Sequence, residues 1–121
     1  LECVRAAAKD CDAIVHAAGG GIVREVRDYY TGNTETTRTL VDAAPPSLKD
    51  FILVSSLAAH GPSGARPATE RDVDAPRSHY GRSKRAAERA ALRLQDRCRV
   101  SVLRPPALYG AGEHRMVPLF Q

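Results

Sequence analysis

The chain has 121 residues, 43% of them hydrophobic, and a formal net charge of +4. This length allows one domain at most, and the apolar fraction is ordinary for a chain that buries a core. No apolar run approaches the roughly 20 residues that cross a bilayer, and no charged-then-apolar leader opens the chain, so we expect neither a membrane span nor a secretory signal.

The cysteines and the positively charged residues bear on where the protein works and on what it binds. The three cysteines, Cys3, Cys11 and Cys98, follow no metal or redox spacing, which favours a reduced, cytoplasmic protein. Many cations gather on and just after one expected helix, at Arg82, Lys84, Arg85, Arg89, Arg93, Arg97 and Arg99. No aromatic residues alternate with them as a stacking platform requires, so we interpret these cations as a solvated helix face and expect no nucleic-acid partner.

Short apolar runs predict three strands, and longer runs with helical spacing predict three helices. The expected elements are a helix at 2–9, a strand at 12–18, a helix at 24–44 broken near Gly32, a strand at 50–56, a helix at 79–95 and a strand at 99–103. Alternation of strands and helices gives βαβ crossovers. We therefore expect a partial Rossmann-like α/β fold, in which a doubly wound parallel sheet carries helices on both faces.

Both ends of the chain suggest a larger domain. The chain opens inside a helix and stops just after a loop. Three parallel strands alone would leave both sheet edges bare. We expect residues 1–121 to be the middle of such a domain.

Each of the expected strands ends in polar, glycine-rich or proline-rich residues. The strand ends are His16-Ala17-Ala18-Gly19, Ser55-Ser56 and Arg104-Pro105-Pro106. Ligands of open α/β sheets bind beyond the carboxyl ends of the strands. Tyr80 and Lys84 stand at the start of the helix that follows the second strand, so we expect them at the same rim of the sheet.

The spacing of Tyr80 and Lys84 suits proton transfer. Residues four apart lie one above the other on a helix, roughly 6 Å apart along its axis. An ammonium there stabilises a phenolate relative to a phenol. The Ser56 hydroxyl can hydrogen-bond a substrate oxygen while Tyr80 gives or takes its proton. Hydride transfer at a carbinol or carbonyl carbon needs these groups, whereas the alternative is a surface tyrosine beside a solvated lysine.

Five blocks in order extend the pattern over nearly the whole chain. They are DAIVHAAG (12–19), GNTETTRTLVDAA (32–44), FILVSSLAAHG (51–61), YGRSK (80–84) and LRPPALYGAGE (103–113). In these blocks the chain resembles the central part of an extended short-chain dehydrogenase/reductase, of the NAD-dependent epimerase/dehydratase family. The resemblance implies an NAD(P)-binding Rossmann-like domain of which this chain lacks the first βαβ unit and the C-terminal substrate lobe.

The resemblance also implies residue roles. Ser56, Tyr80 and Lys84 would be catalytic, with Tyr80 as the acid/base. The residues implied to bind NAD or NADP are Ala17, Ala18, Gly19, Asn33, Tyr80, Lys84, Pro105 and Ala107. Those implied to contact a small-molecule substrate, such as a nucleotide-sugar, a sterol-like molecule or another carbonyl or alcohol compound, are Ser56, Tyr109 and Arg115. Members commonly form homodimers through the helices matching 24–44 and 79–95.

Some positions depart from the family pattern. Leu57 and Ala58 follow Ser56 where dehydratases carry an acidic pair, so dehydration of sugar nucleotides is disfavoured. His60 replaces a common tyrosine, and Thr36 replaces a glycine. The triplet at 19–21 imitates a phosphate loop but lies too close to Tyr80 in sequence to be one. We expect the isolated chain to bind dinucleotide weakly or not at all.

Several alternatives stay open. His16 is either a strand-end histidine satisfied by backbone or a base, and Asn33 either satisfies a helix irregularity or binds cofactor. The histidines expected at the surface are His60, His79 and His114, and Cys98 is expected in the core or at a helix end. Against an oxidoreductase or epimerase stand a non-catalytic dinucleotide sensor or scaffold of the same fold and an inactive truncated product.

Overall fold

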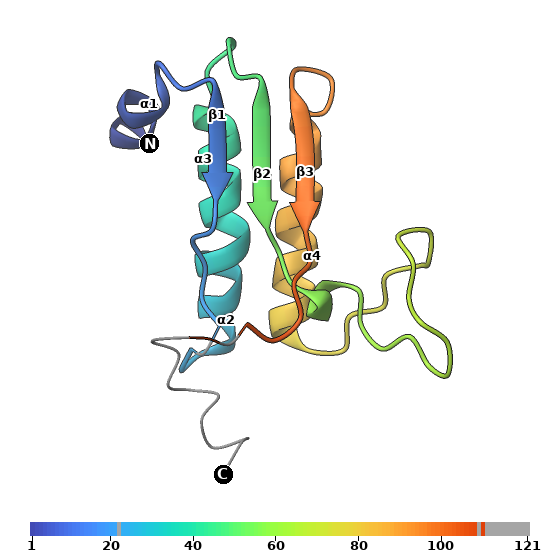
Figure 1. Cartoon of the computed structure of the whole chain (residues 1–121). Coiled ribbons are helices and arrows are strands. Elements are labelled where there is room, and N and C mark those ends of the chain that lie inside the picture. The colour runs from blue at the N-terminus through green and yellow to red at the C-terminus, as the bar shows by residue number, and fades with distance from the viewer. Residues whose placement is uncertain (22, 109, 111–121) are drawn as a thin grey trace.

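A computed structural model of the chain describes residues 1–21, 23–108 and 110. Its sheet has three parallel strands in the order β1-β2-β3 (Figure 1): β1 (Ala13–His16), β2 (Asp50–Val54) and β3 (Arg99–Leu103). All three lie where the apolar runs predict them, and β3 has the predicted bounds. The partial Rossmann-like α/β fold is therefore confirmed.

Helices precede and follow the strands. They are α1 (Glu2–Ala8), α2 (Val26–Tyr29), a π-helical segment (Tyr30–Glu35), α3 (Thr36–Ala43) and α4 (His79–Ala91), with 3-10 turns at Leu57–Ala59 and Leu92–Leu94. The break predicted near Gly32 is thus a wide π turn that joins α2 to α3 without interrupting the helix. Ala44-Pro45-Pro46 ends α3, because proline cannot continue the hydrogen-bond ladder.

The core lies between the sheet and the helices α3 and α4, which both stand behind the sheet in Figure 1. Phe51 and Leu53 point from β2 into this layer and are 0% and 1% exposed. The residues of α3, α4 and the segments after them that cover these side chains are Val41, Ala44, Leu48, Ala87, Ala91 and Leu94. Alanines on α4 let the helix approach the sheet closely.

The opposite face of the sheet differs from the prediction. Strand pairing places Val15 beside Ile52, and Val54 beside Leu103, on the side away from α3 and α4. Val15 is 64% exposed and Leu103 is 52% exposed. The expectation of helices on both faces of the sheet is wrong for the described residues, because both long helices, α3 and α4, pack on one face.

No helix in the described part of the chain is both long and apolar enough to traverse a lipid bilayer.

Candidate active site

The loop after β1 is fastened to the π-helical segment. The Asn33 amide accepts a hydrogen bond from Gly20 N at 3.1 Å and donates one to Gly20 O at 3.2 Å. It also donates to Ser83 Oγ of α4 at 3.0 Å, and Asn33 is only 1% exposed. A side chain on Gly19 would collide with Asn33 Oδ1. Asn33 therefore fixes the path of the glycine loop, a role that neither of its two sequence-based alternatives describes.

His16 at the end of β1 is a structural histidine. Its Nε2 lies 2.9 Å from Thr37 Oγ1, and that hydroxyl donates to Asn33 O at 2.7 Å. The hydroxyl can then accept only from a protonated Nε2, so the neutral ring carries its proton there. Burial, and then the charge of Lys84, lower the pKa of His16. A threonine hydroxyl, and not the backbone expected from the sequence, satisfies this ring.

Lys84 is a buried lysine. Its side chain runs from α4 to the end of β2, where Nζ donates to Val54 O at 2.8 Å, and the residue is 5% exposed. A Cβ on Gly19 would lie 3.7 Å from this Nζ, so the loop after β1 passes beside the ammonium. Burial lowers the pKa of Lys84, and the charge of Glu88 opposes that shift. Lys84 is thus wrongly placed among the solvated cations by the sequence interpretation.

Gly81 brings the start of α4 against the segment that follows β2. A Cβ at this position would overlap the carbonyl oxygen of Ala58, so only glycine permits the approach. Ser56 caps the 3-10 turn that contains Ala58, because Ser56 Oγ accepts from Ala58 N at 3.2 Å. Tyr80 and Ser56 are in this way held on neighbouring backbone segments.

Tyr80 is half-buried at the first turn of α4. Its ring centroid lies 5.8 Å from that of Tyr29 in α2. The neighbouring residues pair as well, since Tyr30 Oη lies 3.2 Å from His79 Nδ1. Among the described residues no hydrogen bond joins the Tyr80 hydroxyl to Ser56 or Lys84, so this hydroxyl is available to a ligand.

A cavity of about 580 Å³ opens beside Ser56. Its lining includes Ser56, Leu57, Arg77, Pro106 and Ala107. Ala107, implied to border the cofactor, thus faces the same space as Ser56. The neighbouring Pro105 accepts a backbone hydrogen bond from Leu57 N at 3.0 Å, which ties the segment after β3 to the segment after β2.

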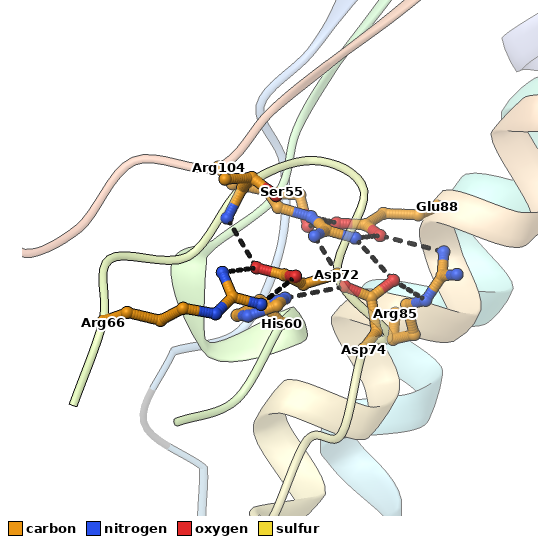
Figure 2. A network of polar contacts seen from close by, with 9 residues as sticks. Ser55, His60, Arg66, Asp72, Asp74, Arg85, Glu88 and Arg104 are labelled. Atoms are coloured by element: carbon orange, nitrogen blue, oxygen red, sulfur yellow. Dashed lines mark hydrogen bonds and ion pairs between the residues drawn. The ribbon is translucent and has the colours of Figure 1, made fainter. Parts of the chain in front are cut away.

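A partly buried charged cluster joins the residues that follow β2 and β3 to α4, and the sequence interpretation does not predict it. Figure 2 shows its members around two carboxylates: Ser55, His60, Asp74, Arg85, Glu88 and Arg104. His60, expected at the surface, is 5% exposed, because its Nδ1 faces Asp74 Oδ1 at 3.2 Å. The sequence signal that could have indicated this cluster is a pair of acidic residues. Glu88 lies in a predicted helix, and Asp74 lies in a loop rich in turn-forming residues.

Other expected positions have simpler outcomes. Ala17, Ala18 and Gly19 are exposed at the end of β1, and their implied contact with a cofactor stays a prediction. His79 is exposed, and Cys98 packs partly buried against the core, as expected. Tyr109, His114 and Arg115 lie outside the described residues.

Comparison with known proteins identifies the family. A family model described as NAD dependent epimerase/dehydratase family matches residues 2–120. The chain belongs to the NAD-dependent epimerase/dehydratase family.

Relatives within and near this epimerase/dehydratase family include a reductase and several epimerase-like structures. The ceramide reductase of Caulobacter vibrioides is 36% identical over 114 residues, which are 94% of this chain and 31% of that protein. A putative epimerase from Burkholderia cenocepacia J2315 superposes with a TM-score of 0.80 at 35% identity, covering 93% of this chain and 38% of that one. MoeE5, solved with UDP-glucose and NAD, gives a TM-score of 0.83 at 28% identity and coverages of 92% and 40%. This chain therefore spans well under half the length of these relatives.

Proposed function

We propose that the protein carrying this chain is an NAD-dependent oxidoreductase or epimerase that acts at a carbinol or carbonyl carbon, with Ser56, Tyr80 and Lys84 as its catalytic residues. The observation that carries the proposal is the buried Lys84. This ammonium stands one turn from Tyr80 and next to the exposed loop at 17–19. Family members with structures support NAD as the cofactor, since MoeE5 was solved with it.

The residues present fit a dinucleotide. Ala17, Ala18 and Gly19 carry no bulky side chains, so a flat ring and ribose can lie against the exposed backbone. Lys84 uses one donor on Val54 O and has two more for ribose hydroxyls. Asn33 acts on this site through the Gly20 backbone, because its own amide is already bonded. Pro105 and Ala107 border the site from the β3 side.

The chemistry assigned to these residues is proton transfer. Ser56 Oγ holds the substrate oxygen, and Tyr80 Oη removes or returns its proton. The Lys84 ammonium stabilises the phenolate through its positive charge, in a site where burial strengthens the interaction. NAD, when bound, supplies the acceptor or donor of the hydride.

The similar proteins suggest the direction of the reaction and the class of substrate. The ceramide reductase supports a reductase of a carbonyl lipid, and MoeE5 with UDP-glucose supports action on a nucleotide-sugar. Dehydration stays disfavoured, because apolar Leu57 and Ala58 follow Ser56. Pairing of two copies through the helical segments 24–44 and 79–95 remains a prediction, as does a cytoplasmic location.

Replacing Tyr80 tests the proposal. In the full-length protein, Tyr80→Phe keeps the ring that packs on Tyr29 but removes the hydroxyl, so NAD(P)-linked turnover should fall by roughly 10²–10⁴-fold, far more than dinucleotide affinity falls. Suitable probes are UDP-glucose, UDP-glucuronic acid and a keto-ceramide, followed by the absorbance of the reduced nicotinamide.

Tyr29→Phe is the matched control, because it removes a neighbouring phenol hydroxyl while the aromatic contact remains. It should keep near-normal turnover. Equal turnover of Tyr80→Phe and the unmodified protein would remove Tyr80 from the acid/base role. Dinucleotide binding without turnover of any probe would favour the non-catalytic alternative.

A further inference from the structure

Two successive residues at the end of β2 are bonded to two successive turns of α4. Lys84 Nζ donates to Val54 O at 2.8 Å, and Ser55 Oγ donates to Glu88 Oε1 at 2.6 Å. Lys84 and Glu88 are four residues apart and so share one face of the helix. Ser56 is the next residue along the chain. Its position is therefore set by two bonds to the same helix that carries Tyr80.

Glu88 is in turn held from two sides. Arg104, directly after β3, donates from Nε to Oε1 at 2.8 Å and from Nη2 to Oε2 at 2.6 Å. Arg85 donates to Oε2 at 3.2 Å. Glu88 is 1% exposed, so every one of these bonds lies in a site where a missing partner would be costly.

A second carboxylate completes the cluster. Asp74, in the loop before α4, accepts two bonds from Arg104, at 2.7 and 3.0 Å. It also lies 2.6 Å from Arg85 Nε and 3.2 Å from His60 Nδ1. Two guanidinium groups balance two carboxylates, and the forked geometry of arginine fixes direction as well as distance. In Figure 2, dashed lines join both Arg104 and Arg85 to Glu88 and to Asp74.

The cluster joins four segments: the end of β2, the loop at 60–74, the helix α4 and the residue after β3. Two of these segments, the end of β2 and α4, carry proposed catalytic groups. Buried ion pairs are often no more stabilising than apolar packing of equal volume. The cluster fixes the position of the end of β2 relative to α4, and apolar residues of equal volume would not reproduce this effect.

We propose that Ser55, Glu88, Arg104 and Asp74 form a positioning clamp that sets the place of Ser56 relative to Tyr80. The clamp rests on the proposed function, since it positions residues assigned there. None of its members is assigned a contact with substrate or cofactor. Ser55 is 5% exposed and faces Glu88, so its hydroxyl acts on the reaction only through the neighbouring Ser56.

The decisive variant is Ser55→Ala in the full-length protein. It removes one hydroxyl and leaves the arginine–carboxylate pairs intact, so the fold should survive. Because small misplacements of reacting groups are costly, kcat should fall by about 10- to 100-fold. The KM for NAD should stay within about twofold, since among the described residues no hydrogen bond joins Ser55 to Lys84 or to the loop after β1. Ser55→Thr, which keeps the hydroxyl, should restore most of kcat.

Controls separate positioning from general stability. Ser47→Ala changes an exposed serine and should leave kcat and the melting temperature unchanged. Glu88→Gln should lower kcat more than Ser55→Ala, whereas Glu35→Gln, at an exposed ion pair with Arg38, should not. If Glu88→Gln fails to fold, Ser55→Ala and Ser55→Thr still decide the question.

The outcomes distinguish the two proposals. Normal kcat in Ser55→Ala, with Tyr80→Phe inactive, overturns the clamp and leaves the proposed function standing. A loss in Ser55→Ala that Ser55→Thr does not restore also overturns it. Normal turnover in Tyr80→Phe overturns the proposed function itself. A selective fall of kcat with recovery in Ser55→Thr supports the clamp.

Discussion

At the scale of single residues, Gly81 and Asn33 show how contacts with other segments determine which amino acid a position can hold. Gly81 lies inside α4, where glycine is a poor helix former, yet the carbonyl of Ala58 leaves no room for a side chain. The side-chain amide of Asn33 accepts a hydrogen bond from Gly20 N and donates one to Gly20 O, and it also donates to Ser83 Oγ. Both residues serve the approach of separate segments and not the helix that contains them.

Gly81→Ala should destabilise the protein despite its better helix propensity. Propensity alone favours alanine by about 1 kcal/mol. The overlap with a backbone oxygen should cost more, for a net loss of about 1–3 kcal/mol as α4 and the 3-10 turn separate. Denaturant unfolding measures the change.

The control for that variant is Gly21→Ala, where a Cβ would meet nothing within 4 Å. It should change the free energy of unfolding by less than about 0.5 kcal/mol. A gain in stability for Gly81→Ala would show that the helix start does not press against Ala58.

At the scale of elements, the π-helical segment sets the direction of α2. It holds one more residue in its turn than an α-helix would, and Thr36 N bonds back to both Asn33 O and Thr31 O. The wide turn places Asn33 toward Gly20 while Tyr29 packs against Tyr80. A regular helix over the same residues would rotate one of these side chains away.

Deleting Thr31 should convert the segment to a regular α-helix. One residue corresponds to about 100° of rotation, so α2 should turn relative to α3 and lose the contact between Tyr29 and Tyr80. The near-ultraviolet circular dichroism of the tyrosines and the backbone chemical shifts at 26–30 measure this change. Deleting Ser63, exposed in the loop before α4, should leave both unchanged. Retention of the tyrosine signal after the Thr31 deletion would contradict the role given to the π turn.

At the scale of the whole molecule, the charged cluster couples the fold to pH. The hydrogen bonds from Arg104, followed by the contact with His60, hold the pKa of Asp74 below its ordinary value of 3.8. A carboxylate whose pKa is lower in the folded state stabilises the fold above its unfolded pKa. That stabilisation is lost as the pH falls through the folded pKa.

The contribution of Asp74 to the free energy of unfolding should therefore be level from pH 7 to about 5 and fall below about pH 4. His16, whose pKa is lowered in the fold, adds a separate loss of stability that begins below about pH 6.5. Asp74→Asn should lower the stability at pH 7 and weaken the dependence on pH below 4, because the titrating group is gone. Denaturant titrations at several pH values measure both effects. Asp42→Asn, at an exposed carboxylate 3.7 Å from Arg93, is the control and should follow the unmodified protein. If the free energy of unfolding of Asp74→Asn fell below pH 4 as it does in the unmodified protein, other carboxylates would be responsible for the loss of stability.

Much of the fold was predictable because its signals are local. The apolar run at 99–103 has the bounds of β3, and the pattern that begins at 79 has the start of α4. The strand predicted at 50–56 is too long, since β2 ends at Val54. The face of the sheet on which α3 and α4 pack was not predictable. Strand residues on both faces are apolar, and only the crossover connections decide on which face the helices lie.

For the candidate site, the sequence by itself determined the order of the strand ends and the placing of Tyr80 and Lys84 on one helical face. Those features follow from chain connectivity and from the helical repeat, which neighbouring residues specify. Only the tertiary structure decided that Lys84 is buried against Val54 and that Ser55, Glu88, Arg104 and Asp74 are bonded together. With 18 basic and 14 acidic side chains, the composition allows many pairings, and the packing of distant segments selects among them.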